Sequence, residues 1–198
     1  MKALIIGCGN IGGMYDINNE GYKTYAKSFF KLGINFDVYD PNKINAEIIS
    51  KAYNANIVQE INSLCKGKYN VFIIASPTYT HFEYLSKIAE YDPKLIICEK
   101  PVSTNIKELN ELEKIYHQKE LRIYVNYQRR YQPKLIKFKQ IINTKLQYKK
   151  VKNIVFTYQN GINNNGSHGL DFLSFIFGIR YNEIKNIFHD MLFNSVKS

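Results

Sequence analysis

The sequence predicts an α/β fold in which a doubly wound parallel sheet is followed by a partial second domain of the α+β type. Three features predict it. Six short apolar bursts recur up to about residue 127, stretches with helical spacing separate them, and the alternation then stops. Alternating strands and helices favour a parallel sheet with right-handed crossovers. We therefore expect one domain over residues 1–120 and a partial domain over residues 121–198.

The expected strands are short and continuously apolar, as buried parallel strands are. They lie at residues 2–7, 36–40, 55–59, 70–76, 94–99 and 122–127. Apolar residues recur with helical spacing at 82–89 and at 106–115. Two helix starts are marked, one by Asp40-Pro41-Asn42 and one by Ser103-Thr104 followed by Glu108.

The second domain is expected to begin with a loop at residues 128–133. An amphipathic segment at 135–142 and a strand candidate at 151–158 follow this loop. A polar stretch that contains glycine, residues 162–169, then leads into an apolar helix.

Composition excludes several classes of protein. Hydrophobic residues make up 45% of the chain and charged residues 22%, which is ordinary for a globular protein. No apolar run approaches the roughly 20 residues of a membrane helix, and the N-terminal run is shorter than the roughly 7 to 15 apolar residues of a signal peptide. Cys8, Cys65 and Cys98 lack metal-site spacing. We expect a cytoplasmic protein with reduced thiols, without a bound metal and without a membrane partner.

The net charge of +10 comes from one part of the chain, residues 121–170, which holds ten basic residues and no acidic one. These are Arg122, Arg129, Arg130, Lys134, Lys137, Lys139, Lys145, Lys149, Lys150 and Lys152. Such a stretch can attract a phosphorylated ligand or nucleic acid, or it can be a solvated lysine face. Because no recognised nucleic-acid motif accompanies it, we expect no nucleic-acid partner.

A glycine-rich loop follows the first expected strand. Residues 7–12 spell Gly7-Cys8-Gly9-Asn10-Ile11-Gly12, the G-x-G-x-x-G pattern. The first glycine permits a tight turn, the second lets backbone amides reach a pyrophosphate, and the third allows close packing. Glycines that merely shape a turn, or the glycine loop of a methyltransferase, remain alternatives. The position directly after a strand favours dinucleotide binding.

Asp40 ends the second expected strand. A carboxylate there accepts hydrogen bonds from ribose hydroxyls and repels a 2′-phosphate, so the sequence favours NAD over NADP. Asp40 lies 28 residues beyond Gly12, where about 20 is usual. The polar residues 14–23 supply the excess, and we expect this insertion to delay or interrupt the first helix and to be able to cover the cofactor or substrate.

Polar side chains also end the fourth and fifth expected strands. The fourth leads into Ser76-Pro77-Thr78 and His81, and the fifth ends on Glu99 and Lys100. Ligands of open parallel sheets bind beyond the carboxyl ends of the strands. We therefore expect these residues on the cofactor side, with Lys100 near the nicotinamide, although a surface lysine at a strand end is the plain alternative.

These motifs together resemble the Gfo/Idh/MocA family of NAD(P)-dependent sugar and cyclitol dehydrogenases. The matching pieces, in order, are GCGNIGG, Asp40, ASPTYTHFEYL, CEKP, VNYQRRYQP and NNNGSHGLDFLSFIFG, which cover nearly the whole chain. The resemblance implies a Rossmann-type first domain that binds the dinucleotide and a second domain for substrate and dimerisation. It also implies transfer of a hydride between NAD and a secondary alcohol of a sugar, nucleotide-sugar or cyclitol.

The resemblance also implies roles for individual residues. Lys100 would polarise the substrate oxygen or relay its proton, since the pKa of a lysine is readily lowered by burial and neighbours. Glu99 would support it from the cofactor side, and the bond before Pro101 could be cis. His168 would face the substrate as a general acid or base, oriented by Asp171 on the same helical face. A capping histidine and a first-turn acid favoured by the helix dipole are the alternatives.

Two departures from the family pattern leave an alternative function open. Asn164 stands where many members carry a proton-transferring aspartate, and the chain is short for the family, whose members continue through an open antiparallel sheet. A non-catalytic NAD-binding module, or a truncated and inactive member, is therefore the alternative to an enzyme. The expected partner is a small sugar-like substrate, phosphorylated or nucleotide-linked if the basic stretch contributes, and a homo-oligomer is compatible with the family.

Overall fold

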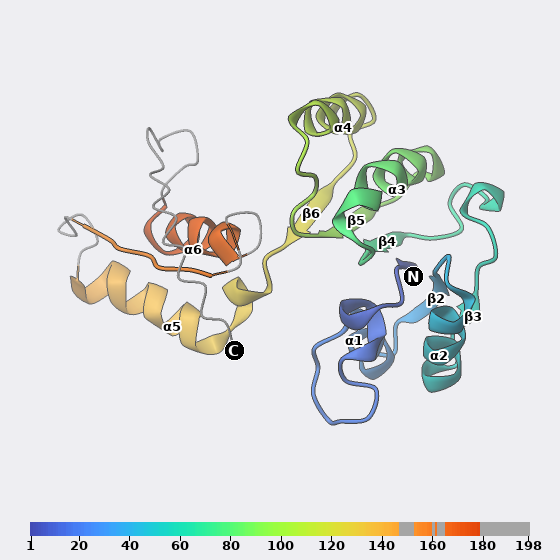
Figure 1. The fold of residues 1–198 in the computed structure, drawn as a ribbon, viewed down its shortest axis with the longest axis horizontal. Helices are drawn as coiled ribbons and strands as arrows, with labels where there is room; N and C mark the ends of the chain where they lie inside the picture. Colours follow the sequence, from blue (N-terminus) through green and yellow to red (C-terminus); the bar gives the residue numbers. More distant parts are fainter. Residues whose placement is uncertain (147–152, 160, 162–164, 179–198) are drawn as a thin grey trace, which may run out of the picture. The chain divides into compact units, whose positions relative to one another are not determined.

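The computed structural model describes residues 1–146, 153–159, 161 and 165–178 (Figure 1). The chain divides into two compact units, Met1–Tyr127 and Gln128–Ser198. Within the described ranges, no helix is long and apolar enough to cross a membrane.

The first unit is built on a six-stranded parallel sheet with the order β3-β2-β1-β4-β5-β6. The strands are β1 (Lys2–Ile6), β2 (Asn35–Tyr39), β3 (Asn56–Ile57), β4 (Val71–Ile74), β5 (Leu95–Glu99) and β6 (Ile123–Asn126). All six predicted strands are present, and the doubly wound parallel sheet is confirmed. Because β6 pairs with β5, the first unit extends past residue 120.

Helices cover both faces of this sheet (Figure 1). The α-helices of the first unit are α1 (Tyr25–Lys31), α2 (Lys43–Tyr53), α3 (His81–Ile88) and α4 (Ile106–Gln118). Short turns are η1 (Asn10–Met14), η2 (Ile61–Ser63), η3 (Thr78–Thr80) and η4 (Ala89–Tyr91). Figure 1 shows α1 and α2 on one side of the sheet and α3 and α4 on the other.

Alternation along the strands explains this layering. Successive strand residues point to opposite faces, so Leu4 and Ile6 of β1 join the core under α3 and α4, while Ala3 and Ile5 join the core under α1 and α2. All four side chains are buried. A strand buried on both faces must be apolar throughout, which is why the bursts in the sequence are continuous.

Both marked helix starts lie next to real caps. Asn42 caps α2, its side chain accepting the backbone N–H of Ile44 at 3.1 Å. At α4 the cap is Asn105, which accepts the N–H of Lys107 at 2.9 Å. Ser103, marked as the start in the sequence, instead accepts the Asn105 N–H at 3.0 Å. The helix therefore begins a few residues later than the Ser103 pattern indicates.

The regular secondary structure described in the second unit is helical. It contains η5 (Gln128–Tyr131), α5 (Pro133–Ile141), η6 (Ile142–Leu146) and α6 (Ser167–Phe177). Phe138 of α5 stacks on Phe172 of α6 with ring centroids 6.2 Å apart. These two helices match the predicted amphipathic and apolar segments.

The strand predicted at residues 151–158 is wrong for its described part, since residues 153–158 form no strand. A strand needs a neighbour to pair its backbone groups, and the described part of this unit offers none. The segment packs instead through Phe156 against Gly169 of α6. A Cβ at Gly169 would lie 2.1 Å from the Phe156 ring, so only glycine permits this approach.

Candidate functional site

The glycine loop follows β1, and the structure explains two of its three glycines. Gly7 has φ +99°, a conformation that side chains disfavour. A Cβ at Gly12 would lie 2.0 Å from the Gly7 carbonyl oxygen, so the two backbones approach too closely for any side chain. Gly9 has φ −73°, and a Cβ there would meet nothing within 4 Å. Neither backbone conformation nor packing within the chain therefore requires glycine at position 9.

Asp40 is joined to this loop. Its Oδ2 accepts the backbone N–H of Cys8 at 2.7 Å, and its Oδ1 accepts the N–H of Asn42 at 2.8 Å. Burial, followed by the charge of Asp40, raises the pKa of the Cys8 thiol to about 12. The acid that ends the second strand is thus held in one orientation beside the first glycines.

A cavity of about 520 Å³ opens between the glycine loop and the ends of β2 and β4. Its lining is Gly7, Gly9, Asn10, Ile11, Tyr15, Asp40, Pro41, Asn45, Ala75, Ser76, Pro77, Tyr79, Thr80 and Tyr84. The structure therefore gathers most of the cofactor residues that the sequence predicts around one space. Gly12 lies beneath the loop, in contact with Gly7, and Thr78 is in the η3 turn next to the lining.

The predicted insertion does interrupt the first helix. After the single π-helical turn η1, residues 15–24 form a loop, and α1 begins only at Tyr25. The loop folds around the fully buried Asp16, whose carboxylate accepts the Thr24 N–H at 3.0 Å and the Thr24 hydroxyl at 2.6 Å. Tyr15, at the start of the loop, lines the cavity.

His81 lies in the interior and is 1% exposed. Its Nε2 lies 2.8 Å from the Ser76 carbonyl oxygen, and its Nδ1 lies 3.0 Å from the Pro101 carbonyl oxygen. The side chain joins the loop after β4 to the loop after β5 and is not among the residues that line the cavity. The sequence predicts His81 beside the cofactor, whereas in the structure His81 lies behind the residues that line the cavity.

Glu99 ends β5 within a closed network of three side chains. The Tyr25 hydroxyl donates to Glu99 Oε1 at 2.7 Å. Asn126, which ends β6, donates from Nδ2 to the same oxygen at 2.7 Å and to the Tyr25 hydroxyl at 2.6 Å. Lys100 follows Glu99, is half-buried, and forms a cis peptide bond with Pro101, as the resemblance implies. Neither Glu99 nor Lys100 lines the cavity beside the glycine loop.

The second unit carries the other predicted catalytic residues. His168 lies in the first turn of α6, and Asp171 follows three residues later, so both lie on one side of the helix. Asp171 is 2% exposed and accepts a hydrogen bond from Arg130 Nε at 2.8 Å, with a second contact from the same guanidinium. The sequence did not predict this ion pair. Asn164 lies outside the described residues.

Sequence reasoning missed Tyr25 and Asn126, which hold Glu99. Tyr25 comes just after the insertion at residues 14–23, and no pattern in the sequence marked it. Asn126 follows a strand in the same way as Glu99 does, and the rule that ligands bind at strand ends could have included it. Tyr79 and Tyr84 of the cavity lining were likewise missed because aromatic residues at helical spacing are usually core.

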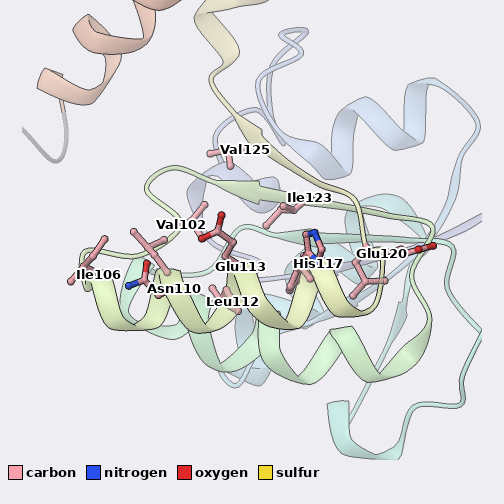
Figure 2. Close-up of a pocket in the computed structure, with 12 residues that line it drawn as sticks. Val102, Ile106, Asn110, Leu112, Glu113, His117, Glu120, Ile123 and Val125 are labelled. Atoms are coloured by element: carbon pink, nitrogen blue, oxygen red, sulfur yellow. The ribbon is translucent and has the colours of Figure 1, made fainter. Parts of the chain in front are cut away.

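A larger cavity, about 860 Å³, lies elsewhere in the first unit. Figure 2 shows Glu113 and His117 of α4 pointing toward the side on which Ile123 and Val125 of the edge strand β6 lie. Its surface is mostly apolar, and it shares no residue with the cavity at the glycine loop. Size alone therefore does not mark the chemistry of this protein, because the predicted site residues gather at the smaller cavity.

A family model described as "Oxidoreductase family, NAD-binding Rossmann fold", that of Gfo/Idh/MocA, matches residues 1–127. This match covers well over half of the chain. The chain belongs to the Gfo/Idh/MocA oxidoreductase family. Curated protein sequences gave no match.

Solved structures of this family share the fold at low sequence identity. A candidate myo-inositol dehydrogenase from Sinorhizobium meliloti 1021 superposes with a TM-score of 0.73 at 19% identity, over 91% of this chain and 56% of that one. An oxidoreductase from Agrobacterium radiobacter in complex with NAD⁺, L-tartaric acid and magnesium gives 0.69 at 17%, over 90% and 55%. UDP-N-acetylglucosamine 3-dehydrogenase from Acidithiobacillus ferrooxidans gives 0.58 at 18%, over 71% and 42%. The chain thus spans about half the length of these proteins.

Proposed function

We propose that this protein is an NAD-dependent dehydrogenase that oxidises a secondary alcohol of a sugar, nucleotide-sugar or cyclitol, or reduces the corresponding ketone. The observation that carries the proposal is the glycine at position 9. Neither a left-handed backbone nor a close contact within the chain requires it, whereas a ligand that lies against the backbone does. Family membership and the sugar-related names of two structural neighbours support the same activity.

The residues around the cavity fit a dinucleotide. Gly9 leaves space next to the loop backbone for the pyrophosphate, and Asp40 is held by two backbone N–H groups in a position that suits the adenosine ribose. Its negative charge opposes a 2′-phosphate, which supports NAD over NADP. Tyr15 and Tyr79 add aromatic surface to the lining.

The nicotinamide ring of the bound cofactor supplies the hydride acceptor. Lys100 acts in one of two ways: as an ammonium it donates to the substrate oxygen, whose negative charge grows as the proton leaves, or as a neutral amine it takes that proton and relays it. Glu99 supports the cofactor side. In the second unit, His168 acts as the general acid or base, and Asp171, whose charge is balanced by Arg130, orients the imidazole.

The basic stretch supports a phosphorylated or nucleotide-linked substrate. Two of its cations already have partners within the second unit: Arg130 pairs with Asp171, and Lys139 Nζ lies 4.0 Å from the centre of the Phe175 ring. Others, such as Lys134 and Lys137, are exposed and could meet an anion. Equal turnover of a neutral sugar and its nucleotide-linked form, insensitive to salt, would count against this part of the proposal.

The decisive experiment combines cofactor titration with a substrate screen. Calorimetry with NAD tests binding, and absorbance of the reduced cofactor tests turnover across sugars, nucleotide-sugars and cyclitols. Lys100→Ala should lower kcat by about a hundredfold or more, as loss of a general acid–base group does, while NAD affinity stays nearly unchanged. Lys114→Ala, at an exposed position on α4, is the matched control and should behave like wild type.

The second candidate is a non-catalytic NAD-binding module, which the amide at Asn164 favours because it cannot take a proton. This candidate predicts NAD binding without turnover of any polyol. If the Lys100→Ala variant still turned over substrate, the protein would be an enzyme, but Lys100 would have no part in its mechanism.

A further inference from the structure

We propose that Tyr25 is a positioning residue for the Glu99 carboxylate and thereby for the nicotinamide half of the cofactor site. The inference rests on the proposed function and deepens it. Its basis is the closed network in which Tyr25, the first residue of α1 after the insertion, meets Glu99 and Asn126 at the ends of β5 and β6.

Both donors of this network act on one carboxylate oxygen. The Tyr25 hydroxyl and Asn126 Nδ2 each lie 2.7 Å from Glu99 Oε1, and Nδ2 also donates to the Tyr25 hydroxyl. Hydrogen bonds to an ionised group are the stronger kind, so two of them fix the side-chain angle of Glu99. Neither bond uses Oε2, and the position of Oε2 is fixed together with that of Oε1.

Tyr25 stays a donor at working pH. Burial raises the pKa of its phenol, and the charge of the nearby Glu99 carboxylate raises it further. The phenol therefore keeps its proton, and the proton has the carboxylate as its acceptor.

The unusual loop is what brings Tyr25 to this place. The loop supplies the extra length between the glycine motif and Asp40, and it ends at Thr24, the cap of α1. Buried Asp16 accepts the N–H and the hydroxyl of Thr24, and Lys27 Nζ donates to the Asp16 carbonyl at 2.7 Å. Tyr25 is the next residue, the first of α1, so its ring starts from a fixed backbone.

This arrangement joins the two halves of the expected site. The loop leaves the glycine motif, lines the cavity through Tyr15, and returns with Tyr25 to the strand end that carries Glu99 and Lys100. Hydrogen bonds that only stabilised the fold would not need to end on Glu99, the residue next to Lys100. Its location at the carboxyl edge of the sheet points to a role in ligand binding.

The test compares NAD with ADP-ribose, which lacks the nicotinamide, by calorimetry on the full chain. Tyr25→Phe removes only the hydroxyl and should weaken NAD binding about five- to tenfold, while ADP-ribose affinity stays unchanged. Tyr22→Phe is the matched control, since Tyr22 belongs to the same loop but is 66% exposed. Asn126→Ala, which removes the other donor, should show the same selective loss and serves as the second variant if Tyr25→Phe melts early.

A double variant tests that Tyr25 acts through the acid. In a Glu99→Gln background, Tyr25→Phe should no longer change the ratio of the NAD and ADP-ribose affinities. Equal loss of both ligands, or no loss of either in a folded Tyr25→Phe protein, would overturn the inference alone. A wild-type chain that binds neither ligand would overturn the proposed function as well.

Discussion

Replacing Gly9 with alanine separates ligand binding from folding. The residue has an extended backbone with φ −73° and ψ −155°, outside the left-handed region that favours glycine, and the added Cβ meets no atom of the chain within 4 Å. Loss of glycine's freedom in the unfolded chain stabilises by about 0.4–1 kcal/mol. Alanine is a poorer cap than glycine for the turn that follows, which offsets part of this. The free energy of unfolding should therefore change by less than about 1 kcal/mol.

NAD binding by the same variant should fall sharply. A methyl group placed where the pyrophosphate lies against the backbone overpacks the contact, which costs about 1–3 kcal/mol. The dissociation constant should rise about ten- to a hundredfold. Calorimetry with NAD measures the affinity, and a thermal melt measures the stability of the same preparation.

Gly12→Ala is the control that should behave in the opposite way. Its Cβ would lie 2.0 Å from the Gly7 carbonyl oxygen, so the loop must shift, and stability should fall by about 2 kcal/mol or more. A Gly9→Ala protein that binds NAD like wild type would show that the ligand does not approach this backbone. A Gly9→Ala protein as unstable as Gly12→Ala would show that the packing argument fails.

Two further predictions concern thiols and acid stability. Burial raises the pKa of the Cys8 thiol to about 12 and also raises that of Cys98, whereas Cys65 is exposed. Iodoacetamide at pH 8 should therefore label Cys65 first, which peptide mass mapping measures. Rapid labelling of Cys8 would contradict this prediction. Burial alone would raise the pKa of Asp37, but hydrogen bonds led by that from Lys2 lower it, so its stabilising effect is present above about pH 4 and is lost as pH falls through the lowered pKa. Asp37→Asn should therefore cost about 1–2 kcal/mol at pH 7 and progressively less below about pH 4 in urea titrations; a cost that is constant with pH would refute the assignment.

The sheet could be predicted from the sequence because its physical requirements act on short segments. A strand buried on both faces is apolar along its length. The apolar runs of β1, β4 and β5 can therefore be recognised in the sequence without knowing which strands lie beside them. The segment at 153–158 shows where that logic fails. Its apolar and β-branched residues resemble a strand, but a strand exists only with a partner, and Phe156 packs on Gly169 of a helix instead.

The candidate site was predictable where a motif requires one type of residue at each position. Gly7 and Gly12 are required by backbone geometry, and Asp40 by its place after β2. Tyr25 could not be found in this way, because its contact with Glu99 spans 74 residues and depends on how an irregular loop folds around a buried acid. Long-range hydrogen bonds between single side chains leave no periodic signal in a sequence.

The His81 ring connects two segments that are far apart along the chain. One nitrogen faces the carbonyl of Ser76 and the other that of Pro101, so this small rigid ring braces the chain after β4 against the chain after β5. Because this ring is interior and contacts both carbonyls, it fixes the spacing between Ser76, in the wall of the cavity at the glycine loop, and the segment next to Lys100.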